Sequence, residues 1–411
     1  MAGDASGWSA SQRHVLTACF LGWMLDAFDY FLVVFVLTRL AHDFVAGMTS
    51  VTWALTLTLM FRPLGALLFG RIADRYGRRP ALIASVLSYS LLECASAFAP
   101  SLTAFIVLRA LYGIAMGGEW GVGASLAFES VPVRSRGLVS GVLQAGYPCG
   151  YLVAAVVFGL LINHVGWRGL FIVGALPSLL LAVYIAKRVP ESAVWSARPG
   201  TAGRRMLWSA LAAHWKLALY AVALMTAFNF FSHGTQDLYP TFLGKQREFS
   251  TGVTSLIAVV YNIGAICGGL FFGRLSGRIG RRRAIALAAL LALPVLPFWA
   301  FSHAPITLAA AAFVMQFMVQ GAWGVVPVHL NELSPGEIRA TFPGVVYQLG
   351  NLIASSNATL QAIIAVRVGG AAHPDYALAL ALVSAITAVA MIVLSLAGPE
   401  RRDVALGAGG G

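Results

Sequence analysis

Five polar side chains with a helical spacing interrupt an otherwise apolar run of residues. Asn229, Ser232, His233, Gln236 and Asp237 recur at intervals of three and four residues, so they form one continuous stripe along a helix. Their amide, hydroxyl, imidazole and carboxylate groups can hydrogen-bond a polar solute. The imidazole and the carboxylate can also exchange a proton. The pattern therefore predicts a polar binding site on a helix whose other faces are apolar.

Charged residues lie inside other long apolar runs. These residues are Asp26, Asp29, Arg62, Arg109 and Glu119. A guanidinium group binds a carboxylate through two parallel hydrogen bonds and stays charged at physiological pH, so Arg62 is the strongest candidate for an anion ligand. The alternative is an ion pair of Arg62 with Asp26 or Asp29 that only joins two helices. Both interpretations can hold, because a substrate carboxylate can compete with an aspartate for the same arginine.

The composition shows what kind of element must position these residues. The chain has 411 residues, of which 59% are hydrophobic and 11% charged, and its mean hydropathy is +0.79. Such a chain cannot cover a soluble surface with polar groups. Its apolar runs are long enough to span a bilayer as helices. We expect an all-α membrane protein with 12 transmembrane helices, and we exclude a disordered chain, a soluble enzyme and an outer-membrane barrel.

In a membrane protein, the basic residues report topology. The net charge is +12, which would suggest a nucleic-acid partner only in a soluble chain. If both termini are cytoplasmic, most Lys and Arg fall in cytoplasmic loops, as the positive-inside rule requires. We expect a multi-pass protein of the cell inner membrane that acts as a monomer in the lipid bilayer. No nucleophile–base set or metal-ligand spacing is evident, so we expect no enzyme activity, no metal, and no cofactor apart from the proton as coupling ion.

The chain contains an internal duplication. Gly70-Arg71-x-x-Asp74-Arg75-x-Gly77-Arg78-Arg79 returns as Gly273-Arg274-x-x-Gly277-Arg278-x-Gly280-Arg281-Arg282, and Gly118-x-Trp120 returns at the same offset as Gly321-x-Trp323. The repeat predicts two pseudo-symmetric six-helix bundles, which we place at residues 1–189 and 216–397, with a cytoplasmic linker at 190–215 and a cytoplasmic tail at 398–411. The buried charges occur only in the first copy, because their equivalents in the second are Asn229, Ser232, Ala265, Ala312 and Ala322. An intramembrane charge costs about 2.5 to 3.5 kcal/mol at mid-bilayer and indicates function by default.

The motifs resemble those of a known family. GRIADRYGRR is similar to the loop signature between helices 2 and 3 of the major facilitator superfamily, and Arg109 occupies the place of that family's helix-4 arginine. Within the family, the stretch from Asn229 to Thr241 fits the pattern N-x-x-[ST]-H-x-[ST]-Q-D-x-x-x-T of the lactate/pyruvate:proton symporters in the sialate:proton symporter family. The resemblance implies uptake of small monocarboxylates such as L-lactate or pyruvate together with a proton, by alternating access.

The resemblance also implies roles for individual residues. Asn229 and His233 on helix 7, with the pair Gln348 and Asn351 on helix 11, would join Arg62 in binding the substrate. The candidates for proton coupling are Asp26, Asp29, His233 and Asp237. Without the family match, the amides could equally serve to hold helices together.

A third set of residues would form conformational latches that pair across the two halves in one state and separate in the other: Gly70, Asp74, Arg75, Gly77, Arg78, Glu129, Arg136, Glu332 and Arg339.

Some alternatives remain open. A sialic acid or other organic-acid:proton symporter of the same family is the nearest one, and a non-transporting membrane sensor on the same scaffold is a distant one. Glu93 has no role that the sequence explains. Five aromatic residues of helices 1 and 5 are expected more as core packing than as cavity lining: Trp23, Phe28, Tyr30, Phe31 and Tyr147.

Overall fold

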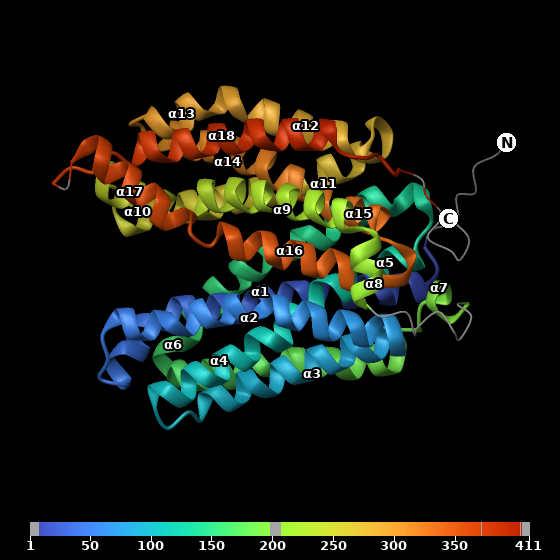
Figure 1. Ribbon diagram of the computed structural model, residues 1–411. Coiled ribbons are helices and arrows are strands. Elements are labelled where there is room, and N and C mark those ends of the chain that lie inside the picture. Colours follow the sequence, from blue (N-terminus) through green and yellow to red (C-terminus); the bar gives the residue numbers. More distant parts are fainter. Residues whose placement is uncertain (1–7, 198–206, 371, 403, 405–411) are drawn as a thin grey trace.

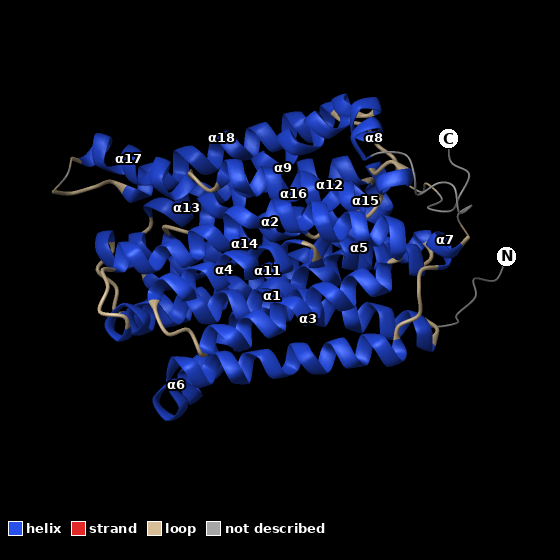
Figure 2. Ribbon diagram, turned by 60° about the horizontal axis from the view of Figure 1, so that its bottom comes forward, coloured by secondary structure: helices blue, strands red, loops and turns tan. Residues whose placement is uncertain are grey.

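The computed structural model of the chain describes residues 8–197, 207–370, 372–402 and 404. All regular structure in these ranges is helical, and Figure 2 shows no strand among them. Parts of the predicted linker (198–206) and of the predicted tail (403 and 405–411) lie outside the described residues. The expectation of an all-α protein is confirmed for the described residues.

The two halves form two layers of helices, the first blue to green and the second yellow-green to red in Figure 1. The first half contains α1 (Ala10–Asp43), α2 (Met48–Tyr76), α3 (Arg78–Ala97), α4 (Leu102–Gly117), α5 (Glu119–Ser130), the 3-10 turn η1 (Val133–Ser135) and α6 (Arg136–Arg188). Two short helices follow, α7 (Ala193–Ser196) and α8 (Leu207–Ala213). The second half contains α9 (Trp215–Gln236), α10 (Tyr239–Thr241), η3 (Phe242–Gln246), α11 (Thr251–Ile279), α12 (Arg281–Ala292), η4 (Leu293–Val295), α13 (Leu296–Phe301), α14 (Pro305–Trp323), α15 (Val326–Leu333), η5 (Gly336–Ile338), α16 (Thr341–Ala354), α17 (Asn357–Gly369) and α18 (Tyr376–Ala397).

Eleven helical stretches of the described chain are long and apolar enough to cross a membrane. One of them, Val133–Arg188, has 56 residues, and its helix is interrupted at Gly166, where φ is 65° and ψ is −177°. Glu191, just beyond its end, accepts from the Arg78 backbone N–H at the α2–α3 junction, and Arg136, at its start, donates to the Val404 carbonyl near the chain end. Both ends of the stretch therefore lie on one side of the molecule, and the stretch makes two passes. Large apolar side chains face outward, among them Leu180 and Ile386 with exposed fractions of 70% and 66%, as lipid contact requires.

The halves meet at the end that carries the α2–α3 and α11–α12 loops, which we call the arginine-rich end. Both described chain ends lie there, because Gln12 donates to the Ser130 carbonyl and Arg136 donates to the Val404 carbonyl. The α2 helix packs closely on α16, where a Cβ added at Gly70 would come within 2.6 Å of the Thr341 Cα. Small residues permit such backbone contact between membrane helices. The contact closes this end of the molecule.

Candidate functional site

A cavity of about 430 Å³ lies between the two halves. Side chains of α1, α2 and α6 line one side, and side chains of α9, α11, α14 and α16 line the other. Helix α1 starts at the arginine-rich end, and its lining residues fall between Trp23 and Phe35, so the cavity lies away from that end. Concave sites of this size with a few convergent polar groups typically bind small molecules.

Arg62 reaches the cavity from α2 and forms an ion pair behind it. Its Nη2 lies 2.9 Å from Asp26 Oδ2 on α1, and the two side chains are 5% and 0% exposed. Arg62 lines the cavity, whereas Asp26 does not. The Arg62 Nε has no hydrogen-bond partner in the described part of the chain. A guanidinium carries five N–H donors, so Arg62 can hold Asp26 and still offer donors to an anion.

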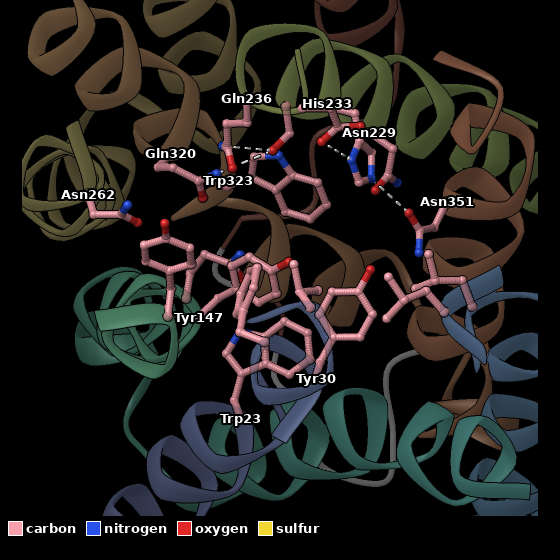
Figure 3. Close-up of a pocket in the computed structure, with 18 of the residues that line it drawn as sticks. Trp23, Tyr30, Tyr147, Asn229, His233, Gln236, Asn262, Gln320, Trp323 and Asn351 are labelled. Atoms are coloured by element: carbon pink, nitrogen blue, oxygen red, sulfur yellow. Dashed lines mark hydrogen bonds and ion pairs between the residues drawn. The ribbon is translucent and has the colours of Figure 1, made fainter. Parts of the chain in front are cut away.

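The polar stripe of α9 faces the same cavity. Asn229, Ser232, His233, Gln236 and Asp237 all line it, and Figure 3 shows their helix above the aromatic side chains of the first half. The α9 stripe is also tied to α14, because Gln236 Nε2 lies 2.9 Å from Gln316 Oε1. A polar stripe on a membrane helix must face protein or water, which this position provides.

His233 contacts two oxygen atoms from different helices. Its Nδ1 lies 3.1 Å from Asp237 Oδ1, one turn along α9, and its Nε2 lies 3.0 Å from Asn351 Oδ1 on α16. A neutral imidazole can donate to only one acceptor, whereas an imidazolium donates to both. If the ring is neutral and donates from Nδ1 to Asp237, Nε2 is an acceptor, and the Asn351 amide must turn its NH2 group toward it. The geometry therefore links the charge of His233 to the position of Asn351.

The first half supplies an aromatic wall, defined here as Trp23, Tyr30, Phe31, Tyr147 and Tyr151, all of which line the cavity. The Phe31 ring lies 5.4 Å from that of Tyr147 and 4.9 Å from that of Tyr151, measured between centroids. The expectation of core packing was therefore wrong for Tyr30, Phe31 and Tyr147, whereas Trp23 lines the cavity and is also packed into the core with 3% exposure. It holds for Phe28, which is 3% exposed and does not line the cavity.

Below the cavity, on the side of the arginine-rich end, the halves are joined by aromatic rings. We call Trp23, Trp120, Trp323 and Tyr347 the aromatic floor. Trp120 of the first half lies 4.7 Å from Tyr347 of the second, and Tyr347 lies 5.5 Å from Trp323. Trp120 and Trp323 occupy equivalent positions of the repeat. Their pairing through Tyr347 separates the cavity from the arginine-rich end.

Several predicted site residues lie elsewhere. Gln348 is 1% exposed and does not line the cavity, since the cavity face of α16 carries Tyr347 and Asn351 instead. The expectation that Gln348 contacts the substrate is corrected for this conformation. Asp29 is also buried outside the cavity lining, near Gly174 of α6.

The helix-4 arginine has a structural partner. Arg109 Nη1 lies 2.7 Å from Glu93 Oε2 on α3, and Arg109 Nη2 donates to Ser96 Oγ at 2.7 Å. Neither Arg109 nor Glu93 lines the cavity. The pair accounts for Glu93, which the sequence left unexplained, and it removes Arg109 from the candidates for direct substrate contact. Glu119, at the start of α5, is fully buried and also lies outside the cavity lining.

Among the latch residues, Asp74 crosses between the halves. Its carboxylate accepts from the Ala340 and Thr341 backbone N–H groups at 3.1 Å and from the Thr341 hydroxyl at 2.7 Å. These donors lie at the N-terminus of α16, where the helix dipole favours an anion. The equivalent position in the second copy is Gly277, so the predicted asymmetry is present in this contact.

The other latch carboxylates bind arginines of their own half in this conformation, while Arg136 of the first half lies within electrostatic range of Glu332 of the second. Pairing of these residues across the halves therefore stays a prediction. Arg78 contacts Asp74 at 2.8 Å and Glu129 at 2.9 Å. In the second half, Glu332 pairs with Arg281 at 2.9 Å. The glycine at the α2–α3 junction, Gly77 with φ of 116°, allows the sharp turn that brings Arg78 over these carboxylates.

The remaining latch residues make different contacts. Arg75 is exposed and lies over the Tyr76 ring. Arg136 donates to the Val404 carbonyl at 2.8 Å, and the Arg339 carbonyl accepts from Ser125 at 3.0 Å, across the halves.

Residues 19–254 match the model of the Major Facilitator Superfamily, and residues 209–401 match that of the Sugar (and other) transporter family. The chain belongs to the major facilitator superfamily. Since members of this superfamily are transporters, the chain is a multi-pass membrane transporter rather than an enzyme.

Three curated relatives of this major facilitator chain have named substrates. A Saccharomyces cerevisiae carboxylic acid transporter protein homolog is 29% identical over 400 residues, which cover 89% of this chain and 64% of the yeast protein. The chain thus spans less than two thirds of that relative's length. The sialic acid transporter NanX of Escherichia coli is 28% identical, with 82% of this chain and 84% of the relative covered. The niacin transporter NiaP of Acinetobacter baylyi is 28% identical, with coverages of 81% and 82%.

A solved structure shows the same fold. The proton:xylose symporter XylE, bound to 6-bromo-6-deoxy-D-glucose, superposes with a TM-score of 0.74 at 17% identity, and the match covers 95% of this chain and 96% of that one. The likeness confirms the expected major facilitator fold of two helical bundles.

Proposed function

We propose that this protein is a proton-coupled symporter of organic acids that works by alternating access. The observation that carries the proposal is Arg62, which is a buried cation that lines a cavity between the halves while its Nε lacks a partner in the described chain. Water competes poorly for a guanidinium in such a place, so an organic anion gains a strong contact there. The relatives named for carboxylic acids, sialic acid and niacin support an acidic substrate.

Substrate and proton would be coupled through the Arg62–Asp26 pair. A carboxylate that binds Arg62 competes with Asp26 for the same N–H donors. An aspartate that loses this partner is a buried, unpaired charge, and taking up a proton removes that charge. Asp26 is therefore the coupling group that the geometry favours. Asp29 remains a candidate of indirect action, because it does not line the cavity.

His233 and Asp237 would form a second proton-responsive element. The imidazole links Asp237 to Asn351, which belong to different helices of the second half. Asn229 and Asn351 offer amide groups to a hydroxyl or keto oxygen of the substrate, and Asn351 can do so only by changing its contact with His233. Substrate binding and the charge of His233 are thereby connected.

The first substrate candidates are small monocarboxylates such as L-lactate or pyruvate. The α9 motif and the amide groups beside Arg62 support this choice. The second candidates are larger planar acids such as niacin, and the aromatic wall and the cavity volume favour them. Pockets of about 300 to 1,000 Å³ hold drug-sized ligands, and this cavity of about 430 Å³ falls in that range.

Topology and assembly follow from the same proposal. We place the protein in the cell inner membrane as a monomer, with the arginine-rich end in the cytoplasm as the positive-inside rule directs. In that orientation the cavity lies on the side of the periplasm and the aromatic floor closes the cytoplasmic side. The conformation is then the one that admits substrate for uptake.

Transport in proteoliposomes tests the proposal. One proton with one monoanion carries no net charge, so the potential, worth about 2.3 kcal/mol per charge per 100 mV, should not drive uptake. A pH gradient, worth about 1.36 kcal/mol per unit, should. We expect lactate or niacin to accumulate when the outside is acidic and to ignore a potassium-diffusion potential. Accumulation that follows the potential alone would defeat one-to-one symport.

The two substrate classes can be separated with one variant. Tyr147→Leu removes one ring from the aromatic wall and leaves Arg62 unchanged. If the aromatic wall binds planar acids, niacin uptake should fall in this variant while lactate uptake stays close to that of the wild type. If the uptake of both acids changes equally, the aromatic wall does not select between them.

A further inference from the structure

In the middle of the first half, buried carboxyl groups outnumber buried guanidinium groups. The described residues there include four acids and two bases, namely Asp26, Asp29, Arg62, Glu93, Arg109 and Glu119. Two ion pairs, Arg62–Asp26 at 2.9 Å and Arg109–Glu93 at 2.7 Å, use both bases. Asp29 and Glu119 are left without an arginine, and neither is assigned a direct contact with substrate.

Glu119 is the more isolated of the two. Its side chain is 0% exposed, and neither carboxyl oxygen has a hydrogen-bond partner in the described chain. The carboxyl group lies against the backbone of α1, because a Cβ at Gly22 would come within 2.4 Å of its Oε1. Burying an ionised carboxylate without partners is far more costly than burying the neutral acid. The geometry therefore suits a carboxyl group that carries a proton.

The groups around Glu119 do not supply a counter-charge in contact with it. The titratable or charged groups that face it are Cys19 and Asp26 on α1, Arg62 on α2 and Tyr89 on α3. Of these, only Arg62 is cationic, and its Nη2 is engaged by Asp26. The other three neighbours are acidic or weakly acidic and do not stabilise a second negative charge.

Glu119 also lies next to the contact between the halves. It shares a void of about 10 Å³ with Cys19, Trp23, Leu143 and Pro327. Pro327 belongs to α15 of the second half. Such a void is about the size that one water molecule needs. Cys19 precedes Trp23 on α1 and Leu143 precedes Gln144 on α6, so the void lies on the arginine-rich side of the aromatic floor.

Helix α5, which carries Glu119, forms hydrogen bonds with the second half. Ser125 on α5 donates its hydroxyl to Asn331 Oδ1 and to the Arg339 carbonyl, both at 3.0 Å and both in the second half. When the halves separate at the arginine-rich end, these bonds must break, and the void beside Glu119 opens to water. A carboxyl group that is fully buried in the present state then becomes exposed to bulk water.

We propose that Glu119 is a proton-release site on the arginine-rich side of the aromatic floor. It holds a proton as the neutral acid while the halves are closed there. When they part, the O–H bond breaks and the proton passes to water. The hydrated carboxylate then takes the proton of Asp26, which faces it, and Asp26 returns as an anion to its ion pair with Arg62 once the substrate has left. The inference rests on the proposed proton symport and adds a step that lies outside the substrate cavity.

Glu119→Gln tests the step because the amide resembles the neutral acid in size and cannot release a proton. The purified full-length chain is reconstituted and measured in two ways: exchange of labelled for unlabelled substrate at equal pH, and accumulation driven by a pH gradient. We expect exchange to be unchanged and accumulation to be lost. Cys19→Ala, which alters the same void but keeps the carboxyl group, should leave both intact. Unchanged accumulation, or equal loss of both activities in a folded variant, would overturn the proposal.

A second measurement does not depend on the substrate. The infrared spectrum of the purified protein should contain the C=O stretch of a protonated carboxyl that is absent in Glu119→Gln and shifted in Glu119→Asp. If the Gln variant does not fold, the Asp variant alone decides, since an unshifted band would refute a protonated Glu119. Failure of the symport proposal appears differently, as a wild type that accumulates no organic acid although the infrared band is present.

Discussion

The Glu93–Arg109 ion pair allows a quantitative prediction about stability. The two side chains are 0% and 1% exposed, and the Arg109 guanidinium also contacts Ser96 Oγ and lies 4.2 Å from the centre of the Tyr112 ring. Glu93→Gln keeps the shape but leaves the guanidinium buried without a counter-charge. Breaking a buried pair in this way costs about 3 to 5 kcal/mol. We expect a loss of that size in the free energy of unfolding, measured by SDS titration of the purified protein with circular dichroism.

The matched control is Glu119→Gln, which makes the same chemical change at a carboxyl without an ion partner. It should lower the free energy of unfolding by less than about 1 kcal/mol, because one neutral polar group replaces another at a position where neither carboxyl oxygen has a partner in the described chain. The double variant Glu93→Gln/Arg109→Met removes both charges and should be more stable than Glu93→Gln alone. A Glu93→Gln protein within about 1 kcal/mol of the wild type would show that the pair behaves like an exposed one and refute the reasoning.

Two further predictions concern transport. Asp74→Asn weakens the charged contacts with the N-terminus of α16, worth about 1.5 to 3 kcal/mol, so the maximal uptake rate should fall more than the KM changes. A raised KM with an unchanged maximal rate would discredit Asp74 as a latch. Asn351→Ala removes a cavity amide and should weaken substrate affinity by about 1 kcal/mol, as measured by competition binding. Gln348→Ala, on the same helix but outside the cavity, is its control, and an equal effect of both variants would contradict the assignment.

The sequence predicted which residues belong to the site better than it predicted which side chains contact each other. The spacing of the α9 stripe implies one polar face, and the structure places all five residues on the cavity. The asymmetry of the repeat singled out Arg62, which also lies there, although its role in binding stays a prediction. These features depend on helical periodicity and on the comparison of the two repeats, both of which a sequence expresses directly.

Contacts between helices were less predictable, because they depend on how each helix is rotated about its axis. Gln348 and Tyr347 are adjacent in sequence, yet only Tyr347 faces the cavity. The pairing of Glu93 with Arg109 requires α3 and α4 to lie side by side in one register, which no local pattern specifies. The aromatic wall was missed for a related reason, since aromatic residues are common on every face of membrane helices.

The latch residues show a further limit. The repeated Glu and Arg residues suggested pairs between the halves, but Glu129 and Glu332 bind Arg78 and Arg281 of their own half. The α2–α3 turn at Gly77 directs Arg78 back over its own bundle. Among the charged latch residues, the sequence distinguishes only Asp74, because Gly277 replaces it in the second copy of the repeat.

The central claim is that Arg62 holds the carboxylate of the substrate. Isothermal titration of an organic acid into the purified protein tests it most directly, with Asp26→Asn/Arg62→Met as the variant, because that change leaves no unpaired buried charge. The account predicts that the wild type binds the acid and that the folded double variant releases no binding heat. Binding by the double variant with the affinity of the wild type would contradict the account.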